Sequence, residues 1–216
     1  MSEAQKSGSV LTTAIILGAL AAICSALVAL TYDVTEERIV ENRQRFLEES
    51  LAPMLEGIEY EGKLSDSTLT IPAPNDLPGN DDVLVYRVYA DGQPVAAIFS
   101  VSARDGYAGI IRLLVGVSAA GTVNRVRVLE HRETPGLGDR IESTKSDWME
   151  HFNGRSIGDP ALDSWNIRRD GGDFDQLSGA SITSRAVVKA VRETLVYFAA
   201  ESERVFAAAS DNPEGS

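Results

Sequence analysis

The first part of the chain is dominated by one long apolar stretch. No charged residue occurs from Ser7 to Tyr32, and the apolar core of this stretch, Val10–Leu30, contains 21 residues. A helix of about 20 apolar residues crosses a bilayer, whereas a cleavable signal peptide has a shorter apolar region of roughly 7 to 15 residues. We therefore expect residues 10–32 to form a transmembrane helix that follows a cytoplasmic arm of residues 1–9.

A helical pattern continues after this stretch and then gives way to an irregular segment. Residues 33–56 carry apolar side chains close to helical spacing, with Thr35 as a candidate N-cap and Pro53 near the end. Residues 58–82 contain three prolines among Gly, Asn and Asp residues, which is typical of a loop. We expect residues 33–82 to form a juxtamembrane helix and a connection.

The central part of the chain predicts consecutive β-strands followed by a turn-rich region. Asp91-Gly92 and Ala120-Gly121 separate strand-like runs and have the composition of hairpin turns. In the turn-rich residues 132–175, three aromatic side chains are candidates for buried anchors: Trp148, Phe152 and Trp165. The predicted strands are Val83–Tyr89, Pro94–Ala103, Gly109–Val117 and Thr122–His131.

The C-terminal part predicts one amphipathic helix. Apolar residues recur at three- and four-residue steps over residues 184–206, and residues 207–216 have the composition of a disordered tail. The fold class is therefore α+β, with an N-terminal transmembrane helix followed by one domain, residues 83–206. In this domain helices pack on a mainly antiparallel sheet.

Charge and cysteine content exclude several classes of function. The chain has 32 acidic and 20 basic residues, and its net charge of −12 disfavours a nucleic-acid partner on electrostatic grounds. The single cysteine, Cys24, lies in the apolar stretch, so we expect no internal disulfide and no cysteine-based metal site. The two histidines, His131 and His151, lack further ligands nearby and are expected to be structural or solvated. No nucleotide-binding or hydrolase motif gives the chain a catalytic residue of its own.

One segment ahead of the C-terminal helix combines small residues with hydroxyl groups. Ser178, Gly179, Ala180 and Ser181 carry no bulky side chain, so a ligand can approach the backbone closely. The free N–H groups of the following helix favour an anion at this place. Taken on residues alone, an ordinary helix cap formed by small residues and Thr183, with a tight packing turn, is the more common explanation of such a segment.

Four short motifs carry a resemblance to a known family. They are DQLSGASITS at residues 175–184, ETPGLGD at residues 133–139, GYAG at residues 106–109 and DGGDFD at residues 170–175. Together they resemble the FMN-binding domain shared by the G subunit of the Rnf electron-transport complex and the C subunit of the sodium-pumping NADH:quinone reductase. The ETPGLGD and DGGDFD runs are more similar to the Rnf subunit, and the resemblance covers essentially the whole chain.

The resemblance implies a cofactor and its attachment site. The family esterifies the phosphate of FMN to the hydroxyl that follows Gly-Ala, which here is Ser181, with serine in place of the more usual threonine; Thr183 is the alternative acceptor. Tyr107 is interpreted equally well as a flavin contact or as an aromatic residue at a strand end. Arg168 and Arg169 are expected to be an exposed pair rather than phosphate ligands. The full set of expected cofactor-binding residues is Ser181, Ser178, Gly179, Ala180, Thr183, Glu133, Thr134, Gly136, Leu137, Gly138, Tyr107 and Asp175.

The resemblance also implies a function and partners. We expect a membrane-anchored electron-transfer subunit that carries covalent FMN within an ion-translocating ferredoxin/NADH oxidoreductase complex. Its partners are the other subunits of that membrane complex and a flavin transferase that attaches the cofactor. The expected location is the bacterial inner membrane, with the C-terminal domain facing the periplasm. The alternative is a non-redox scaffold or sensor module with the same fold.

Overall fold

The computed structural model describes residues 15–25, 50–62 and 64–207. The chain divides into two compact units, Met1–Glu49 and Ser50–Ser216. In the first unit, residues 15–25 form a helix with exposed side chains. Among the described helices, none is both long enough and apolar enough to cross a membrane. Most of the expected transmembrane and juxtamembrane helices, at residues 10–32 and 33–56, lies outside the described residues.

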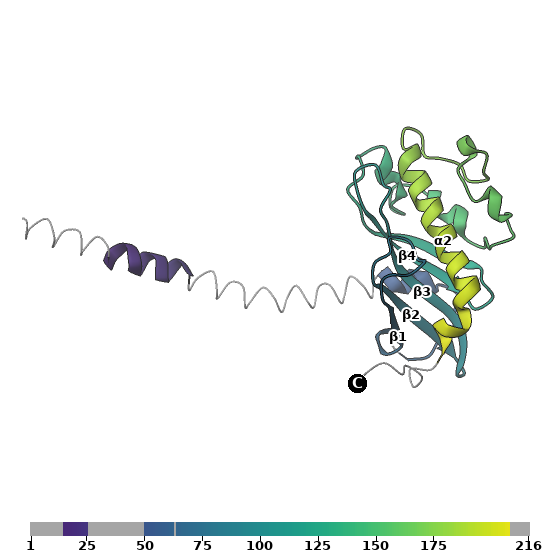
Figure 1. Cartoon of the computed structure of the whole chain (residues 1–216), viewed down its shortest axis with the longest axis horizontal. Helices are drawn as coiled ribbons and strands as arrows, with labels where there is room; N and C mark the ends of the chain where they lie inside the picture. Colours follow the sequence, from purple (N-terminus) through teal and green to yellow (C-terminus); the bar gives the residue numbers. More distant parts are fainter. Residues whose placement is uncertain (1–14, 26–49, 63, 208–216) are drawn as a thin grey trace, which may run out of the picture. The chain divides into compact units, whose positions relative to one another are not determined.

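The second unit is built on a five-stranded antiparallel sheet in which the strands follow one another in sequence order. The strands are β1 (Thr68–Ile71), β2 (Val83–Ala90), β3 (Gln93–Ala103), β4 (Ile111–Ser118) and β5 (Val123–Glu130). The four predicted strands are confirmed as β2 to β5, and the prediction of an antiparallel sheet is confirmed as well. Figure 1 shows the sheet with the long C-terminal helix lying across it.

The strand β1 was missed because the sequence gives it almost no signal. It lies in residues 58–82, which we expected to be irregular, and it has only four residues. Among them Ile71 alone is buried, so no alternating pattern can develop. Pairing with β2, in which Ile71 lies opposite Val83, makes this short segment an edge strand.

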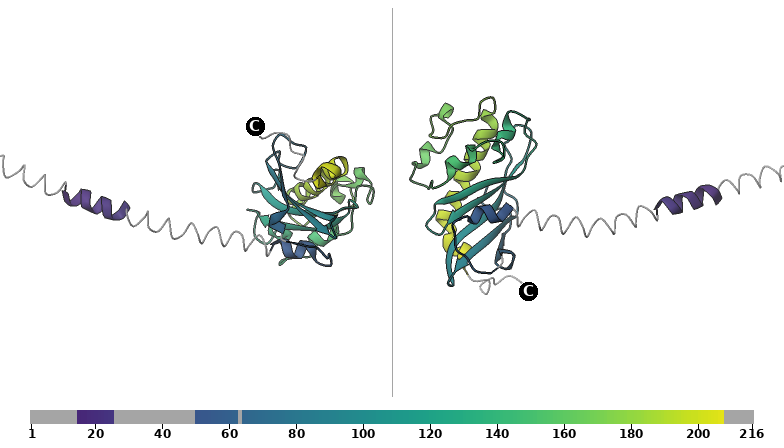
Figure 2. Two further views of the ribbon diagram at one scale, coloured as in Figure 1. Left: turned by 90° about the horizontal axis from the view of Figure 1, so that it is seen from below. Right: turned by 180° about the vertical axis from the view of Figure 1, so that it is seen from behind.

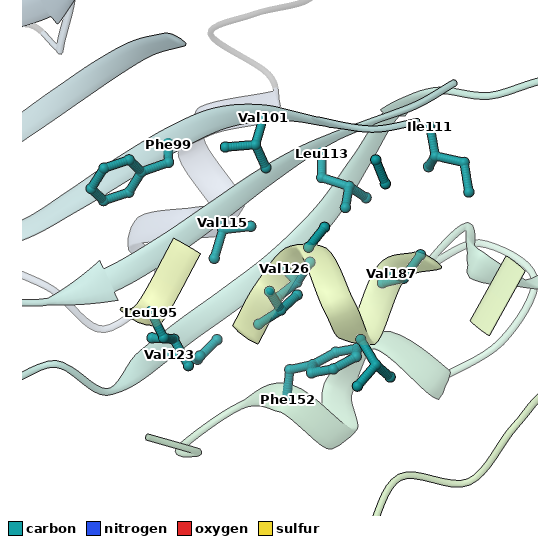
Figure 3. Close-up of a cluster of buried hydrophobic side chains, with 14 of the residues drawn as sticks. Phe99, Val101, Ile111, Leu113, Val115, Val123, Val126, Phe152, Val187 and Leu195 are labelled. Carbon is teal, nitrogen blue, oxygen red and sulfur yellow. The ribbon is translucent and has the colours of Figure 1, made fainter. Parts of the chain in front are cut away.

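Helix α2 (Ser181–Phe206) covers one face of the sheet. Its buried side chains, among them Val187 and Leu195, pack against inward-facing strand residues such as Phe99, Leu113 and Val115, as Figure 3 shows. The helix begins at Ser181, three residues before the predicted start at Ser184. The predicted start was too late because threonine is a common N-cap residue, whereas the hydroxyl group of Thr183 donates a hydrogen bond to Glu133 in the loop after β5.

The opposite face of the sheet is covered by the short 3-10 helix η1 (Ala52–Leu55), which Figure 2 shows against the sheet in the view from behind. Met54 of η1 lies so close to the sheet that a Cβ atom at Gly116 would be 3.2 Å from its terminal methyl group. A second apolar layer therefore forms on this face, from residues that alternate with those facing α2: Tyr86, Val88, Ala96, Ile98 and Leu114.

Short 3-10 helices and an aromatic cluster organise the turn-rich region between β5 and α2. Trp148, Phe152 and Trp165 are buried, as predicted, and Phe174 joins them with ring-centroid distances of 5.0 Å to Phe152 and 4.8 Å to Trp165. This cluster fixes the loops that surround the start of α2. The short helices are η3 (Gly138–Ile141), η4 (Trp148–Phe152), η5 (Leu162–Ser164) and η6 (Arg168–Asp170), in addition to η2 (Leu64–Asp66) near β1.

Candidate functional site

A cavity of about 370 Å³ opens where three segments distant in sequence come together. The connection between β3 and β4 supplies Tyr107, and the loop after β5 supplies Glu133, Thr134, Leu137 and Gly138. The first turn of α2 and the residues before it form the third wall, and Arg169 of η6 completes the site. The lining residues are Tyr107, Glu133, Thr134, Leu137, Gly138, Arg169, Gly179, Ala180, Ser181, Ile182 and Thr183.

The N-terminus of α2 forms one wall of this cavity. Ser181 is the first residue of the helix and is partly exposed, with Ala180 as N-cap and without a side-chain cap. The N–H groups of the first helical residues have no acceptor within the helix, and they mark the positive end of its dipole. Gly179 has φ +79°, and a Cβ atom there would come within 2.9 Å of Leu137. A small residue in the left-handed region is therefore needed to bring Ser181 to the cavity.

Glu133 ties the three walls together. Its side chain is buried, and Oε2 accepts a hydrogen bond from the hydroxyl group of Thr183, which is itself 1% exposed. Oε1 accepts a hydrogen bond of 3.0 Å from the backbone N–H of Ala108 in the β3–β4 connection. Each carboxylate oxygen thus holds a different wall of the cavity.

Two glycines leave room for this carboxylate. A Cβ atom at Gly138 would lie 2.9 Å from Glu133 Oε2 and 3.0 Å from Thr183 Oγ1. A Cβ atom at Gly106 would lie 3.0 Å from Glu133 Oε1 and 2.2 Å from the carbonyl oxygen of Gly109. The space around Glu133 is therefore available only because both positions lack a side chain.

A charged network supports the loop from behind. His131 accepts a hydrogen bond from the backbone N–H of Glu133 at Nδ1, and its Nε2 lies 2.9 Å from Glu142. The Lys145 ammonium group contacts both Asp139 and Glu142, and these contacts lower the pKa of each carboxyl group below its usual range. The same two carboxylates raise the pKa of Lys145. These bonds hold the ETPGLGD loop in one conformation.

Three large apolar side chains line the cavity yet remain exposed to solvent. Tyr107 is 67% exposed, Leu137 43% and Ile182 46%, and each comes from a different wall. Exposed apolar side chains that converge on a concave site are typical of a surface that receives a ligand.

Most of the residues expected from the sequence meet at this cavity. Ser181, Gly179, Ala180, Thr183, Glu133, Thr134, Leu137, Gly138 and Tyr107 all line it. Ser178, Gly136 and Asp175 do not. The Asp175 carboxylate pairs with Arg168 at 3.3 Å, and its carbonyl oxygen accepts a hydrogen bond from the Trp148 indole, so this residue supports the loop.

The structure adds two residues that sequence reasoning did not assign to the site. Arg168 and Arg169 are both exposed, as expected, but Arg169 also lines the cavity, whereas Arg168 pairs with Asp175. No sequence signal separates these adjacent arginines. Ile182 was given no role because the helix was expected to begin at Ser184, whereas the observed start at Ser181 makes it part of the exposed first turn.

The residues present fit FMN. The cavity is within the usual size range of small-molecule sites, about 300 to 1,000 Å³. Arg169 and the free N–H groups of α2 can bind a phosphate, and the hydroxyl group of Ser181 lies beside them. The apolar side chains of Tyr107, Leu137 and Ile182 suit a planar ring. A larger depression of about 470 Å³, lined by Asp76, Leu162, Asp163, Asn166, Arg192, Glu193 and Val196, has no comparable set of groups.

Comparison with known proteins first defines the class. The family model described as FMN-binding domain matches residues 106–196, which include all the walls of the cavity, and a model described as RnfG N-terminal region matches residues 1–54. The second unit is therefore an FMN-binding domain.

Full-length relatives then define the family. The G subunit of the ion-translocating oxidoreductase complex of Pseudomonas aeruginosa is 45% identical over 92% of this chain and 93% of its own length. The protein of the same name from Pseudoalteromonas atlantica is 40% identical over 91% of this chain and 92% of its own length. The solved structure of NqrC from Shewanella oneidensis superimposes with a TM-score of 0.48 at 23% identity, covering 64% of this chain and 70% of that one. The chain belongs to the family of G subunits of the ion-translocating oxidoreductase complex.

Proposed function

We propose that this protein is an electron-transfer subunit that carries FMN covalently, through a phosphoester at Ser181. The observation that carries this proposal is the position of Ser181 at the first residue of α2, in the wall of the cavity. A phosphate ester formed there keeps one negative charge, which the helix N-terminus stabilises by about 0.3 to 1 kcal/mol. Membership in a family named for an ion-translocating oxidoreductase complex supports the redox role over that of a scaffold or sensor.

The two candidate hydroxyl groups differ in their surroundings, and the difference favours Ser181. Thr183 is buried and donates its hydroxyl hydrogen to Glu133, so esterification there would remove a buried hydrogen bond. Ser181 is partly exposed. An attaching enzyme can therefore reach Ser181 without opening the contact between α2 and the loop after β5.

Attachment requires one phosphoryl transfer and no redox change. The oxygen Oγ of Ser181 forms a bond to the FMN phosphorus of FAD, the bond between that phosphorus and the bridging oxygen of the pyrophosphate breaks, and AMP leaves. The proton of the serine hydroxyl passes to a base of the flavin transferase that we propose as maturation partner. Arg169 and the N–H groups of Ile182 and Thr183 contribute positive charge beside the phosphorus.

The chain's own residues hold and shield the cofactor. Bound FMN supplies reversible uptake and release of electrons. Tyr107, Leu137 and Ile182 provide apolar surface for a ring and exclude water from it. The bonds from Glu133 to Thr183 and to Ala108 keep the three walls in place.

We propose that the protein is held in the bacterial inner membrane by residues 10–32, with the FMN domain on the periplasmic side. The uncharged stretch and its 21-residue apolar core support an anchor. Covalent attachment suits such a location, because flavin lost from an exported domain is not replaced. The partners are the other subunits of an ion-translocating membrane complex.

The test is co-expression of the full chain with a flavin transferase, followed by denaturing gel electrophoresis. The wild-type band should be fluorescent, Ser181→Ala should be dark, and Ser181→Thr should be as bright as wild type. Thr183→Ala should stay fluorescent while the protein loses stability by about 1 to 3 kcal/mol, because the Glu133 carboxylate loses a buried partner. A fluorescent Ser181→Ala band would refute attachment at Ser181.

A further inference from the structure

Glu133 is the only acidic residue among those that line the cavity, and its side chain is 4% exposed. A carboxylate in such a position is costly, because it gives up hydration for a few hydrogen bonds. An amide side chain of similar size carries no charge, but it offers one acceptor oxygen to the two donors, whereas the carboxylate offers two. The carboxylate therefore satisfies both donors, and it also brings a full negative charge to the cavity.

Hydrogen bonds hold Glu133 at both carboxylate oxygens and at its backbone N–H group. Thr183 donates to Oε2, and the N–H of Ala108 donates to Oε1. The backbone N–H of Glu133 itself donates to His131, which fixes the main chain below the side chain. Gly106 and Gly138 crowd the same oxygens so closely that neither position accepts a Cβ atom. The group cannot turn away from the cavity without disturbing all three walls.

This carboxylate has no positive partner within the part of the chain that the structure describes. No Lys, Arg or His nitrogen pairs with it there, whereas the nearby carboxylates of Asp139 and Glu142 both contact Lys145. Its hydrogen-bond donors, a hydroxyl and an amide, are neutral. The carboxylate therefore lies at a small, partly apolar cavity, and no cation is paired with it to neutralise its charge.

We propose that Glu133 sets the redox potential of the cofactor, its carboxylate lowering the midpoint potential of FMN held in this cavity. The inference rests on the proposed function. Two electrons and one proton from solvent convert the flavin ring to its reduced anion, which carries one more negative charge than the oxidised ring. A fixed negative charge in the same cavity opposes that gain, and the site's low polarity makes the effect larger than it would be in water.

The direct test is a redox titration of the covalently loaded full-length protein, with an electrode or dithionite supplying the electrons. Glu133→Gln keeps the size of the side chain and removes its charge. The reduction equilibrium should shift toward the reduced form on the order of tenfold, which corresponds to an increase of about 30 mV for a two-electron couple. Because the group is buried, the shift should persist at high salt.

Two variants separate a charge effect from a structural one. Val115→Ala removes buried volume from the core between the sheet and α2, away from the cavity, so it should lower the melting temperature and leave the midpoint potential close to that of wild type. Glu130 lies three residues before Glu133, and its carboxylate is 62% exposed and pairs with Arg112, so Glu130→Gln should change neither quantity appreciably. Melting temperatures of Glu133→Gln and Val115→Ala in the Ser181→Ala background give the structural cost without any flavin.

Each outcome bears on the inference. An unchanged midpoint potential in loaded Glu133→Gln would overturn it, and so would an equal shift in Val115→Ala. A Glu133→Gln protein that is unfolded, or folded but without flavin, would also overturn it, because the carboxylate would then be needed to build the site. Absence of flavin from the wild type itself would instead refute the proposed function.

Discussion

Gly136 and Gly138 are two residues apart in the loop after β5, yet each is glycine for a different reason. Gly136 has φ +78° and open space where a Cβ atom would lie. Gly138 lies outside the left-handed region, but a Cβ atom there would collide with Glu133 and Thr183. One position needs conformational freedom and the other needs space.

These two needs predict different outcomes for alanine substitution. Gly136→Ala should lower the free energy of unfolding by about 1 to 2 kcal/mol through backbone strain, and covalent flavin should still be incorporated. Gly138→Ala should cost about 1 to 3 kcal/mol through overpacking and should also reduce incorporation, because it displaces the Glu133 carboxylate. Chemical denaturation and in-gel flavin fluorescence measure the two effects. Full incorporation in Gly138→Ala would show that the carboxylate can move without harm.

Sequence reasoning at this scale found the hydroxyl-bearing turn and most of the loop that faces it. It could not choose between Arg168 and Arg169, because adjacent arginines look alike until the 3-10 helix η6 directs one to Asp175 and the other to the cavity. It also gave Asp175 a cofactor-binding role, although the structure places its carboxylate on Arg168. The direction of each side chain depends on tertiary contacts that no local pattern records.

At the scale of elements, the loop from Glu133 to Glu142 is stabilised by the ion pairs that Lys145 forms with Asp139 and Glu142. Lys145 lowers the pKa of the Asp139 and Glu142 carboxyl groups, so these groups stabilise the fold at pH values above the pKa of the unfolded chain. The contribution is lost as the pH falls through the lowered values in the folded state. Lys145 has a raised pKa, so its own contribution is lost only under strongly alkaline conditions.

Lys145→Met should therefore reduce stability at neutral pH and leave it almost unchanged in acid. The unfolding free energies of wild type and variant should differ at about pH 6 to 7, and the difference should shrink below about pH 4, as the pH approaches the lowered pKa values of Asp139 and Glu142 and both groups become protonated. Denaturant titrations across this range test the prediction, with high salt reducing the difference because Lys145 is 42% exposed. A constant difference down to about pH 2 would show that packing, not charge, accounts for the loss.

The elements themselves were predictable to different degrees. The strands β2 to β5 are eight or more residues long and rich in apolar residues, and the sequence located them to within about two residues. The short strand β1 was missed because pairing with β2, rather than its own pattern, makes it a strand. The start of α2 was placed too late because Thr183 resembles a cap until its contact with Glu133 is known.

At the scale of the whole molecule, the account requires the FMN domain to be exported and the chain to remain anchored. A reporter enzyme that is active only in the periplasm should be active when it is fused after Ser216. The fusion protein should also sediment with membranes. If residues 10–32 form the proposed anchor, replacing two central leucines of this uncharged stretch by arginine should release the protein from the membrane fraction. A cytoplasmic reporter signal would contradict the proposed orientation.

Tandem mass spectrometry of the flavin-loaded wild-type protein shows which hydroxyl group carries FMN. Trypsin should release residues 170–185, a peptide that contains Ser181 as well as Ser178, Thr183 and Ser184. The added mass of one esterified FMN should be found on fragments that contain Ser181 and on no fragment that lacks it. Fragments that place this mass on Thr183, or an unmodified peptide from protein made with an active transferase, would rule out attachment at Ser181.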